Sequence, residues 1–219
     1  MINHFQKTIQ IFINPFIFKI KKGGDIISSY IILDIETTGL SKHYHRITEI
    51  AAVKFENNKV VDQFETLINP QISIPAFITS LTGITNEMVS NAPTIDKIMP
   101  HFLNFVGDSV IVAHNATFDH GFLAKNAERV GLNFPNKRLC TRKLANRLLP
   151  QLPSKKLSMI CYHLGIKNKQ ENRAMTDVLA TVEVFSKFLE ELDFMGINEQ
   201  EHIMKFERSS IKKYRPNNF

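Results

Sequence analysis

Tryptophan is absent from this chain, and cysteine occurs only twice in its 219 residues. Two cysteines are too few for the disulfide framework of a small secreted domain, and they form no zinc-binding pattern. Cys140 and Cys161 both lie among apolar residues, so we expect two buried, reduced thiols. That state indicates a reducing compartment, and the sequence therefore predicts a cytoplasmic protein.

Long hydrophobic runs are also missing. The apolar stretch at residues 9–20 is too short to cross a bilayer as a helix, and Asn14, Pro15 and Lys19 interrupt it. It has neither a basic start nor a small-residue cleavage site, so it is a poor signal peptide. We therefore expect no membrane span. We interpret residues 1–28 as an N-terminal extension and linker, and favour an accessory strand or docking arm over a membrane-surface anchor.

Charge of neither sign dominates the chain. Lysine and arginine number 27 and aspartate and glutamate 21, which gives a formal net charge of +6 at pH 7. This mild excess is compatible with a polyanionic partner, but ordinary surface lysines explain it equally well. The charge alone thus leaves nucleic-acid binding open.

The length and the hydrophobic fraction of 43% fit one α/β domain with extensions. Apolar runs bounded by turn residues predict five strands, over 29–34, 48–55, 60–68, 109–113 and 138–141. Helical periodicity predicts helices over 74–81, 94–106, 119–130, 141–149, 157–164 and 175–192. This order predicts a mixed five-stranded sheet, an antiparallel meander plus parallel strands, flanked by helices. The domain would span residues 29–192, and the polar residues 193–219 would form a C-terminal surface tail.

Four carboxylates stand where an apolar strand ends or a helix begins. Asp34 and Glu36 are two residues apart on one strand, so their side chains point to the same face. Asp119 and Asp177 each stand near the start of a predicted helix, where the helix dipole favours a negative charge. Clustered carboxylates are costly without a cation, and oxygen ligands suit hard ions such as Mg²⁺ or Mn²⁺. Taken together, the four residues predict a metal centre; taken singly, they could be solvated turn residues and a helix cap.

Three sequence segments carry a resemblance to a known family. They are Asp34-Ile-Glu-Thr-Thr-Gly39, His114-Asn-Ala-Thr-Phe-Asp119 and Arg173-Ala-Met-Thr-Asp177. In this order, and with a Leu81-Thr-Gly-Ile-Thr85 loop between the first two, the chain resembles the DEDD superfamily of 3′→5′ exonucleases over residues 29–192. Within it, the chain is similar to the histidine-type branch of the DNA polymerase III epsilon subunit and PolC-type proofreading domains. The resemblance implies a ribonuclease H-like fold.

The resemblance also implies an activity and its cofactors. We expect a metal-dependent 3′→5′ exonuclease that releases nucleoside monophosphates from single-stranded ends in DNA proofreading or repair. Asp34, Glu36, Asp119 and Asp177 would hold two divalent cations, Mg²⁺ or Mn²⁺, and Glu36 would also orient the attacking water. The implied partners are single-stranded DNA, with RNA as an alternative, and a DNA polymerase subunit or sliding clamp. Residues 200–206 faintly resemble a clamp-binding peptide, although a polar tail is the better interpretation.

The matching segments supply the candidates for substrate binding, which are Thr37, Thr38, Gly39, Leu40, His114, Asn115, Phe118 and Arg173. The two threonines offer hydroxyl and backbone N–H groups to a terminal nucleotide, and Leu40 is a candidate wedge beside its base. Plainer alternatives stay open: Leu40 could pack in the core, and His114 could be a structural histidine. Arg173 could be solvated instead of bound to phosphate, and Phe118 is better interpreted as a core residue than as a stacking ring.

One position departs from the family. The histidine-type branch has its general base five residues before the last aspartate, where this chain has Asn172. The tyrosine-type branch has its tyrosine one residue later, where this chain has Arg173. An amide cannot take a proton from water near neutral pH, so Asn172 predicts weakened catalysis. Three explanations stay open: an engineered change, a natural variant with weak activity or only nucleic-acid binding, and a polymerase-docking module without catalysis.

Four other histidines could in principle replace the missing base, namely His43, His45, His120 and His163. His43 and His45 lie in a loop after the first motif, so they are the first to consider. We expect His120 to point away from the site on its helix and His163 to lie on a polar helix face.

Overall fold

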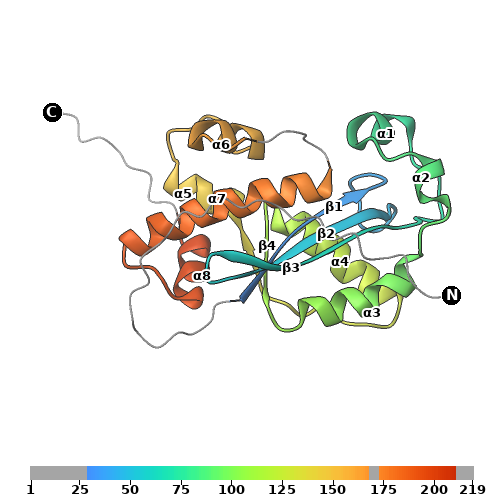
Figure 1. The fold of residues 1–219 in the computed structure, drawn as a ribbon, viewed down its shortest axis with the longest axis horizontal. Coiled ribbons are helices and arrows are strands. Elements are labelled where there is room, and N and C mark those ends of the chain that lie inside the picture. The colour runs from blue at the N-terminus through green and yellow to red at the C-terminus, as the bar shows by residue number, and fades with distance from the viewer. Residues whose placement is uncertain (1–28, 168–172, 211–219) are drawn as a thin grey trace.

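A central sheet separates two layers of helices in the computed structural model, which describes residues 29–167 and 173–210 (Figure 1). The strands are β1 (Ser29–Thr37), β2 (Ile47–Glu56), β3 (Lys59–Leu67), β4 (Val110–Ala113) and β5 (Arg138–Cys140). Their order across the sheet is β3-β2-β1-β4-β5, so that β1 lies at the centre.

The two neighbours of β1 run in opposite directions. β1 pairs antiparallel with β2 and parallel with β4, and β4 pairs parallel with β5. The hairpin between β2 and β3 turns at Asn57 and Asn58, whose φ angles of 50° and 60° asparagine tolerates better than most residues. These pairings confirm the predicted mixed sheet of an antiparallel meander followed by parallel strands.

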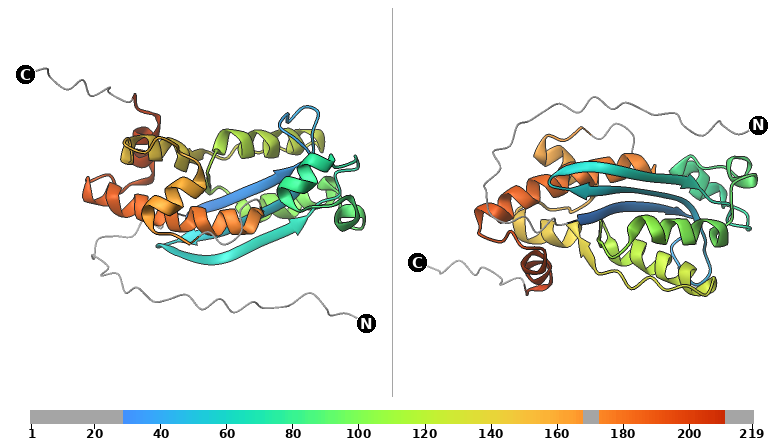
Figure 2. Two further views of the ribbon diagram at one scale, coloured as in Figure 1. Left: turned by 90° about the horizontal axis from the view of Figure 1, so that it is seen from above. Right: turned by 60° about the horizontal axis from the view of Figure 1, so that its bottom comes forward.

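The helices in the described part of the chain cover both faces of this sheet. They are α1 (Ala76–Thr82), α2 (Asn86–Ser90), α3 (Ile95–Val106), α4 (Ala116–Arg129), α5 (Thr141–Leu148), α6 (Leu157–Leu164), α7 (Ala174–Phe194) and α8 (Gln200–Arg208). One core cluster joins the sheet to α3 and α4, and a second joins it to α5, α6, α7 and α8. Figure 2 shows these two layers on opposite sides of the strands.

Alternate residues of β1 face these two layers. Tyr30 and Ile32 are buried in the cluster that contains α7, whereas Ile31, Leu33 and Ile35 are buried on the α4 side. Because side chains alternate along a strand, Asp34 and Glu36 continue the row that starts with Tyr30 and Ile32. The face of β1 that α7 covers therefore changes from apolar to acidic toward the end of the strand.

The C-terminal region differs from the predicted surface tail. α7 continues to Phe194, and α8 packs on the domain with Ile203 and Met204 only 1% and 2% exposed. The prediction was wrong because the segment is mostly polar, and its few apolar residues gather on the one face of α8 that meets the core. The faint clamp-peptide resemblance at residues 200–206 falls on this helix, whose apolar side chains are used internally.

Other predictions meet the structure only in part. Both cysteines are buried, as expected. None of the helices in residues 29–167 and 173–210 is long and apolar enough to traverse a bilayer. The extension at residues 1–28 and Asn172 lie outside the described residues.

Replacing Ile203 by alanine tests whether α8 belongs to the domain. Ile203→Ala should lower the free energy of unfolding by about 2–4 kcal/mol, because it leaves a cavity in the core. Lys205→Ala on the exposed face of the same helix should change it by less than about 0.5 kcal/mol. Urea denaturation followed by circular dichroism measures both. Equal, small effects would mean that α8 is only loosely attached.

Candidate metal centre

The acidic end of β1 meets the start of α7. Asp177 lies in the first turn of α7, on the helix that packs over β1. Carboxylate oxygens of Asp34, Glu36 and Asp177 lie within 4.8 Å of one another, and each of the three side chains is partly exposed. Figure 1 shows the N-terminal end of α7 directed toward the end of β1. Two residues that are two positions apart on one strand and a third from a distant helix are thus brought to one point.

The fourth carboxylate approaches from the other layer. Asp119 lies in the first turn of α4, which follows β4, the parallel neighbour of β1. The residue is 3% exposed, and the backbone N–H groups of Ile35 and of Asp119 itself lie close enough to its carboxylate to favour the charged form. Ile35 lies between Asp34 and Glu36 on β1, so its closeness places Asp119 against the part of the strand that carries these two acids. Helices on opposite faces of the sheet therefore deliver their carboxylates to the same strand end.

Burial and mutual repulsion disfavour the charged forms of these groups. Burial, and then the charge of Asp119, raise the pKa of Asp34 well above its ordinary value. Burial, and then the charge of Glu49, raise the pKa of Glu36 to about 8. Burial raises the pKa of Asp119 to about 7 despite its backbone hydrogen bonds. Four hard oxygen donors that repel one another in this way fit divalent cations of the Mg²⁺ or Mn²⁺ type.

A fifth carboxylate, Glu49, lies beside this cluster, and we did not predict it from the sequence. It lies on β2 directly opposite Glu36 and is 1% exposed. Its Oε1 accepts a hydrogen bond from the Arg173 guanidinium at 2.8 Å, and its Oε2 accepts one from the backbone N–H of Ala174 at 3.2 Å. Glu49 thus anchors the first residue of α7. A lone acid within the apolar run Ile47–Phe55 was the signal that could have revealed it.

The same contact bears on the predicted role of Arg173. Its guanidinium pairs with Glu49 through both Nε, at 3.3 Å, and Nη2, at 2.8 Å. The side chain is therefore not simply solvated, which was the plainer alternative. The Nε and Nη2 donors of Arg173 are already used by a carboxylate. Arg173 therefore helps to hold the start of α7, and these donors are not free to bind a phosphate.

The threonines of the first motif hold the loop that follows β1. The hydroxyl of Thr37 donates to the carbonyl of Gly39 at 2.7 Å, and the hydroxyl of Thr38 accepts the backbone N–H of Arg46 at 3.0 Å. Gly39 has a φ of 155°, and a Cβ there would lie 2.4 Å from the His45 ring, so only glycine fits. Leu40 is 86% exposed, which excludes core packing and leaves the wedge as its remaining interpretation.

The second motif combines internal support with some exposed groups. Nδ1 of His114 lies 2.9 Å from the hydroxyl of Thr141, and its Nε2 lies 2.8 Å from the carbonyl of Lys155. Burial lowers the pKa of His114, which favours a neutral ring. Its structural role is to join the segments that carry Thr141 and Lys155. Asn115 is exposed just before α4. Phe118 is half-buried and packs on Phe122 with the ring centres 4.8 Å apart, as expected of a core residue.

The alternative histidines are mostly engaged elsewhere. His45 accepts the backbone N–H of Ser41 at Nδ1, at 3.0 Å, and its ring packs against Gly39. Nε2 of His120 lies 2.9 Å from the carbonyl of Asn136. His163 is exposed on α6, and His43 is exposed in the loop after β1. Of these two exposed histidines, His43 is the one on the loop that follows Glu36, so it remains the first candidate.

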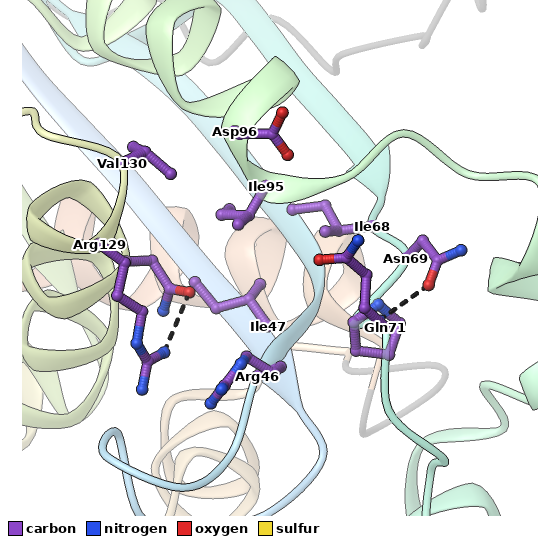
Figure 3. Close-up of a pocket in the computed structure, with 11 residues that line it drawn as sticks. Arg46, Ile47, Ile68, Asn69, Gln71, Ile95, Asp96, Arg129 and Val130 are labelled. Carbon is purple, nitrogen blue, oxygen red and sulfur yellow. Dashed lines mark hydrogen bonds between the residues drawn. The ribbon is translucent and has the colours of Figure 1, made fainter.

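A separate pocket of about 250 Å³ lies behind this loop (Figure 3). Its lining includes Arg46, Asn69, Asp96 and Arg129, and none of the four clustered carboxylates borders it. Arg46 and Arg129 lie beside each other at its edge, as Figure 3 shows. This pocket is therefore distinct from the acidic cluster. Its two arginines donate hydrogen bonds to backbone carbonyls of the loop after β1.

The raised pKa values predict how stability depends on pH without metal. Between about pH 4.5 and 8 the folded state binds more protons than the unfolded chain, because the pKa values of Glu36 and Asp119 are raised to about 8 and about 7. The free energy of unfolding in EDTA should therefore fall as the pH rises through this range, by up to about 1.4 kcal/mol per pH unit for each extra bound proton. Urea denaturation at several pH values measures this.

Two variants and a metal addition complete that test. Glu36→Gln should flatten the decline, whereas Glu191→Gln, on the exposed side of α7, should leave it unchanged. Mn²⁺ added at pH 8 should stabilise the unaltered chain by mass action. A stability that neither falls with pH nor responds to Mn²⁺ would show that the carboxylates do not form one site.

Comparisons with known proteins identify the family of this chain. The exonuclease family model matches residues 31–185. The DNA polymerase III epsilon subunit of Aquifex aeolicus is 36% identical over 185 residues, which cover 84% of this chain and 92% of that protein. A PolC-type DNA polymerase III of Clostridium perfringens is 45% identical over 172 residues, 77% of this chain but only 12% of the polymerase.

A solved structure supports the same assignment. Exonuclease X, in complex with 5′-overhanging duplex DNA, is 26% identical with a TM-score of 0.66, and the match covers 81% of this chain and 99% of that one. The fold is accordingly ribonuclease H-like, as predicted. The chain therefore belongs to the exonuclease family and is homologous to the exonucleases of DNA polymerase III epsilon subunits and PolC-type polymerases.

Proposed function

We propose that this chain is a metal-dependent exonuclease that removes nucleoside monophosphates from the 3′ end of single-stranded DNA. The observation that carries the proposal is the convergence of Asp34, Glu36 and Asp177 within 4.8 Å, with Asp119 coupled to them electrostatically. A binding module without catalysis would gain nothing from holding four repelling carboxylates together. Membership of the exonuclease family points to the same chemistry.

The four carboxylates would hold two divalent cations. When bound, such ions lower the pKa of a water and stabilise the charge that develops on the leaving oxygen of a phosphodiester. Glu36 would accept a hydrogen bond from the attacking water and so orient it. The Thr38 N–H is engaged by the Arg46 carbonyl, so the backbone N–H of Thr37 and the hydroxyl proton of Thr38 would hold the terminal nucleotide. Leu40 would separate its base from the next.

A role in DNA replication follows from the relatives. The similar proteins include a DNA polymerase III epsilon subunit and PolC-type polymerases, so we propose that the chain proofreads or trims DNA beside a polymerase. RNA is the alternative substrate. A sliding clamp is a weaker candidate, because Ile203 and Met204 of the clamp-peptide-like segment are buried in the chain's own core.

Substrate direction is tested with labelled oligonucleotides. A 5′-fluorescein single strand should shorten stepwise in Mn²⁺ with release of mononucleotides, and a 3′-phosphate should block it, since the terminal 3′-hydroxyl end is what a narrow acidic site admits. Asp34→Asn is the matched control and should abolish digestion, because it removes a proposed ligand. Matched DNA and RNA strands decide the substrate. Efficient cutting of a circular single strand would contradict an end-directed mechanism.

Asn172 is tested by restoring the histidine of the family. Asn172→His should raise the rate by about 10²- to 10⁴-fold, since an amide cannot take the proton of the attacking water. The variant should gain a titration near pH ~6.5 in its rate profile, which the Asn172 chain should lack. Mn²⁺ affinity should hardly change, because this position is not a proposed ligand. Asn172→Gln is the control and should bring no gain.

If Asn172→His is no faster, another group already serves as the base. His43 would then be the first to replace, since it is exposed in the loop after β1. Loss of the remaining activity in His43→Gln, with Mn²⁺ binding retained, would identify it.

A further inference from the structure

The loop between β1 and β2 displays apolar side chains that the fold does not use. Leu40 is 86% exposed and Tyr44 is 80% exposed, although both are large. Their neighbours Lys42 and His43 are exposed as well. Hydrophobic side chains on a loop beside a candidate active site, flanked by basic residues, are suited to an anionic ligand with flat apolar faces.

This loop is closed by its own hydrogen bonds. At its base, the Thr38 N–H donates to the Arg46 carbonyl at 2.8 Å, and the Arg46 N–H donates to the Thr38 hydroxyl at 3.0 Å. At its tip, the N–H groups of Tyr44 and His45 both donate to the Ser41 carbonyl, at 3.1 and 2.8 Å. The backbone that carries Tyr44 is thus a compact turn closed by hydrogen bonds at its base and at its tip.

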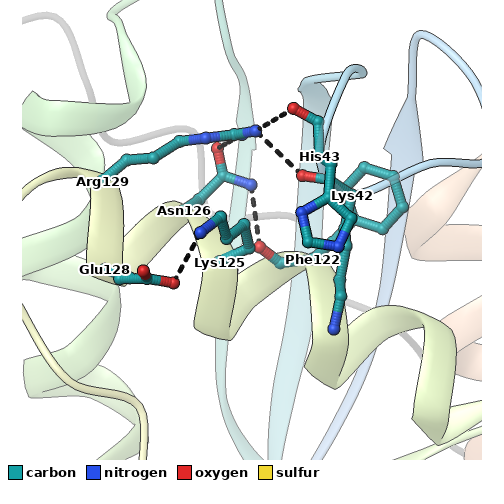
Figure 4. A network of polar contacts seen from close by, with 7 residues as sticks. All are labelled: Lys42, His43, Phe122, Lys125, Asn126, Glu128 and Arg129. Carbon is teal, nitrogen blue, oxygen red and sulfur yellow. Dashed lines mark hydrogen bonds and ion pairs between the residues drawn. The ribbon is translucent and has the colours of Figure 1, made fainter.

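Arg129 of α4 clamps this turn from outside. Its Nη2 donates to the carbonyls of Lys42 and His43, at 2.9 and 2.7 Å (Figure 4). Its Nη1 donates to Oδ1 of Asn126 at 3.4 Å, and Nδ2 of Asn126 donates to the carbonyl of Phe122 at 2.8 Å. The guanidinium is therefore held on its helix while it holds two successive carbonyls of the loop.

The clamp joins the loop to the acidic cluster through one rigid element. α4 carries Asp119 in its first turn and Arg129 in its last. The loop is also connected directly to the cluster at its other end, because it follows Glu36 on β1. The backbone of Tyr44 is consequently held at a set place relative to the carboxylates, while its side chain is exposed and contributes nothing to the core.

We propose that the loop of residues 40–46 is a stacking platform for a nucleobase upstream of the terminal nucleotide, with Tyr44 as the base-contacting ring and Arg129 as the residue that positions it. This rests on the proposed function, which places a single strand at the acidic cluster. Aromatic rings bind successive bases without regard to sequence, and exposed Lys42 complements the phosphates between them. A platform ordered before the strand arrives avoids the entropic cost of ordering it on binding.

The test is binding of a 5′-fluorescein oligothymidylate, measured by fluorescence anisotropy with Ca²⁺ in place of Mg²⁺. Tyr44→Ala should weaken strand binding by about 5- to 100-fold, the usual effect of losing one stacked base. Tyr44→Phe keeps the ring and should restore most of that affinity. Phe194→Ala is the matched control: this ring is 89% exposed at the opposite end of α7 and should not matter. Unchanged strand affinity in Tyr44→Ala overturns the proposal.

The role of Arg129 is tested by Arg129→Lys, which keeps the charge but not the two-carbonyl clamp. Strand binding should weaken, and adding Tyr44→Ala should weaken it little further, because the ring has already lost its place. Independent effects that multiply would instead make Arg129 a separate phosphate contact and overturn its positioning role. Binding of the mononucleotide dTMP should be unchanged in these variants. Parallel losses for dTMP and the strand would mean that the metal centre itself is disturbed.

Hydrolysis by the unaltered chain is assayed separately. Digestion in Mn²⁺ with no effect of Tyr44→Ala on binding would support the exonuclease and overturn the platform. A Tyr44-dependent affinity without any digestion, even by Asn172→His, would support the platform and overturn the exonuclease.

Discussion

Repulsion among buried carboxylates is the constraint on which the rest of this structure depends. Asp34, Glu36, Asp119 and Asp177 come from three elements and two helical layers, and burial raises the pKa of Asp34, Glu36 and Asp119. Nothing in such a cluster is self-stabilising, so the surrounding packing must hold it together until cations are bound. The apolar row of Tyr30 and Ile32 under α7, which precedes the acids on the same face of β1, provides that packing.

The Glu49–Arg173 pair helps to hold these repelling carboxylates in place. A buried ion pair adds little net stability, because desolvation of the two charges offsets their attraction. Its value here is geometric: Glu49 holds the side chain of Arg173 and the N–H of Ala174, and so fixes where α7 begins. Asp177 stands one turn later. A fifth negative charge opposite Glu36 raises the electrostatic cost of the cluster, and the same charge secures the helix that carries Asp177.

Helix α4 has a comparable double role. Its first turn places Asp119 against β1, and its last turn holds the carbonyls of the loop after β1 through Arg129. The acidic cluster and the exposed loop are therefore parts of one rigid assembly, not a site with an independent flap. Stiffness of this kind suits a reaction in which a strand end must be presented repeatedly in the same geometry.

The sequence by itself determined the mixed sheet, the family and the four clustered acids, because these depend on local periodicity and short motifs. Alternation along β1 is a property of any strand, and it places Asp34 and Glu36 on one face before any contact is known. Only the tertiary structure decided what contacts those motifs. Glu49 acts on Arg173 across 124 positions, and Arg129 acts on Lys42 and His43 across 87 and 86. The polar composition of residues 193–219 also gave no indication of α8, because the burial of its few apolar residues depends on the part of the domain on which the helix packs. Pairings so distant in the chain follow from how layers pack, and no local pattern encodes them.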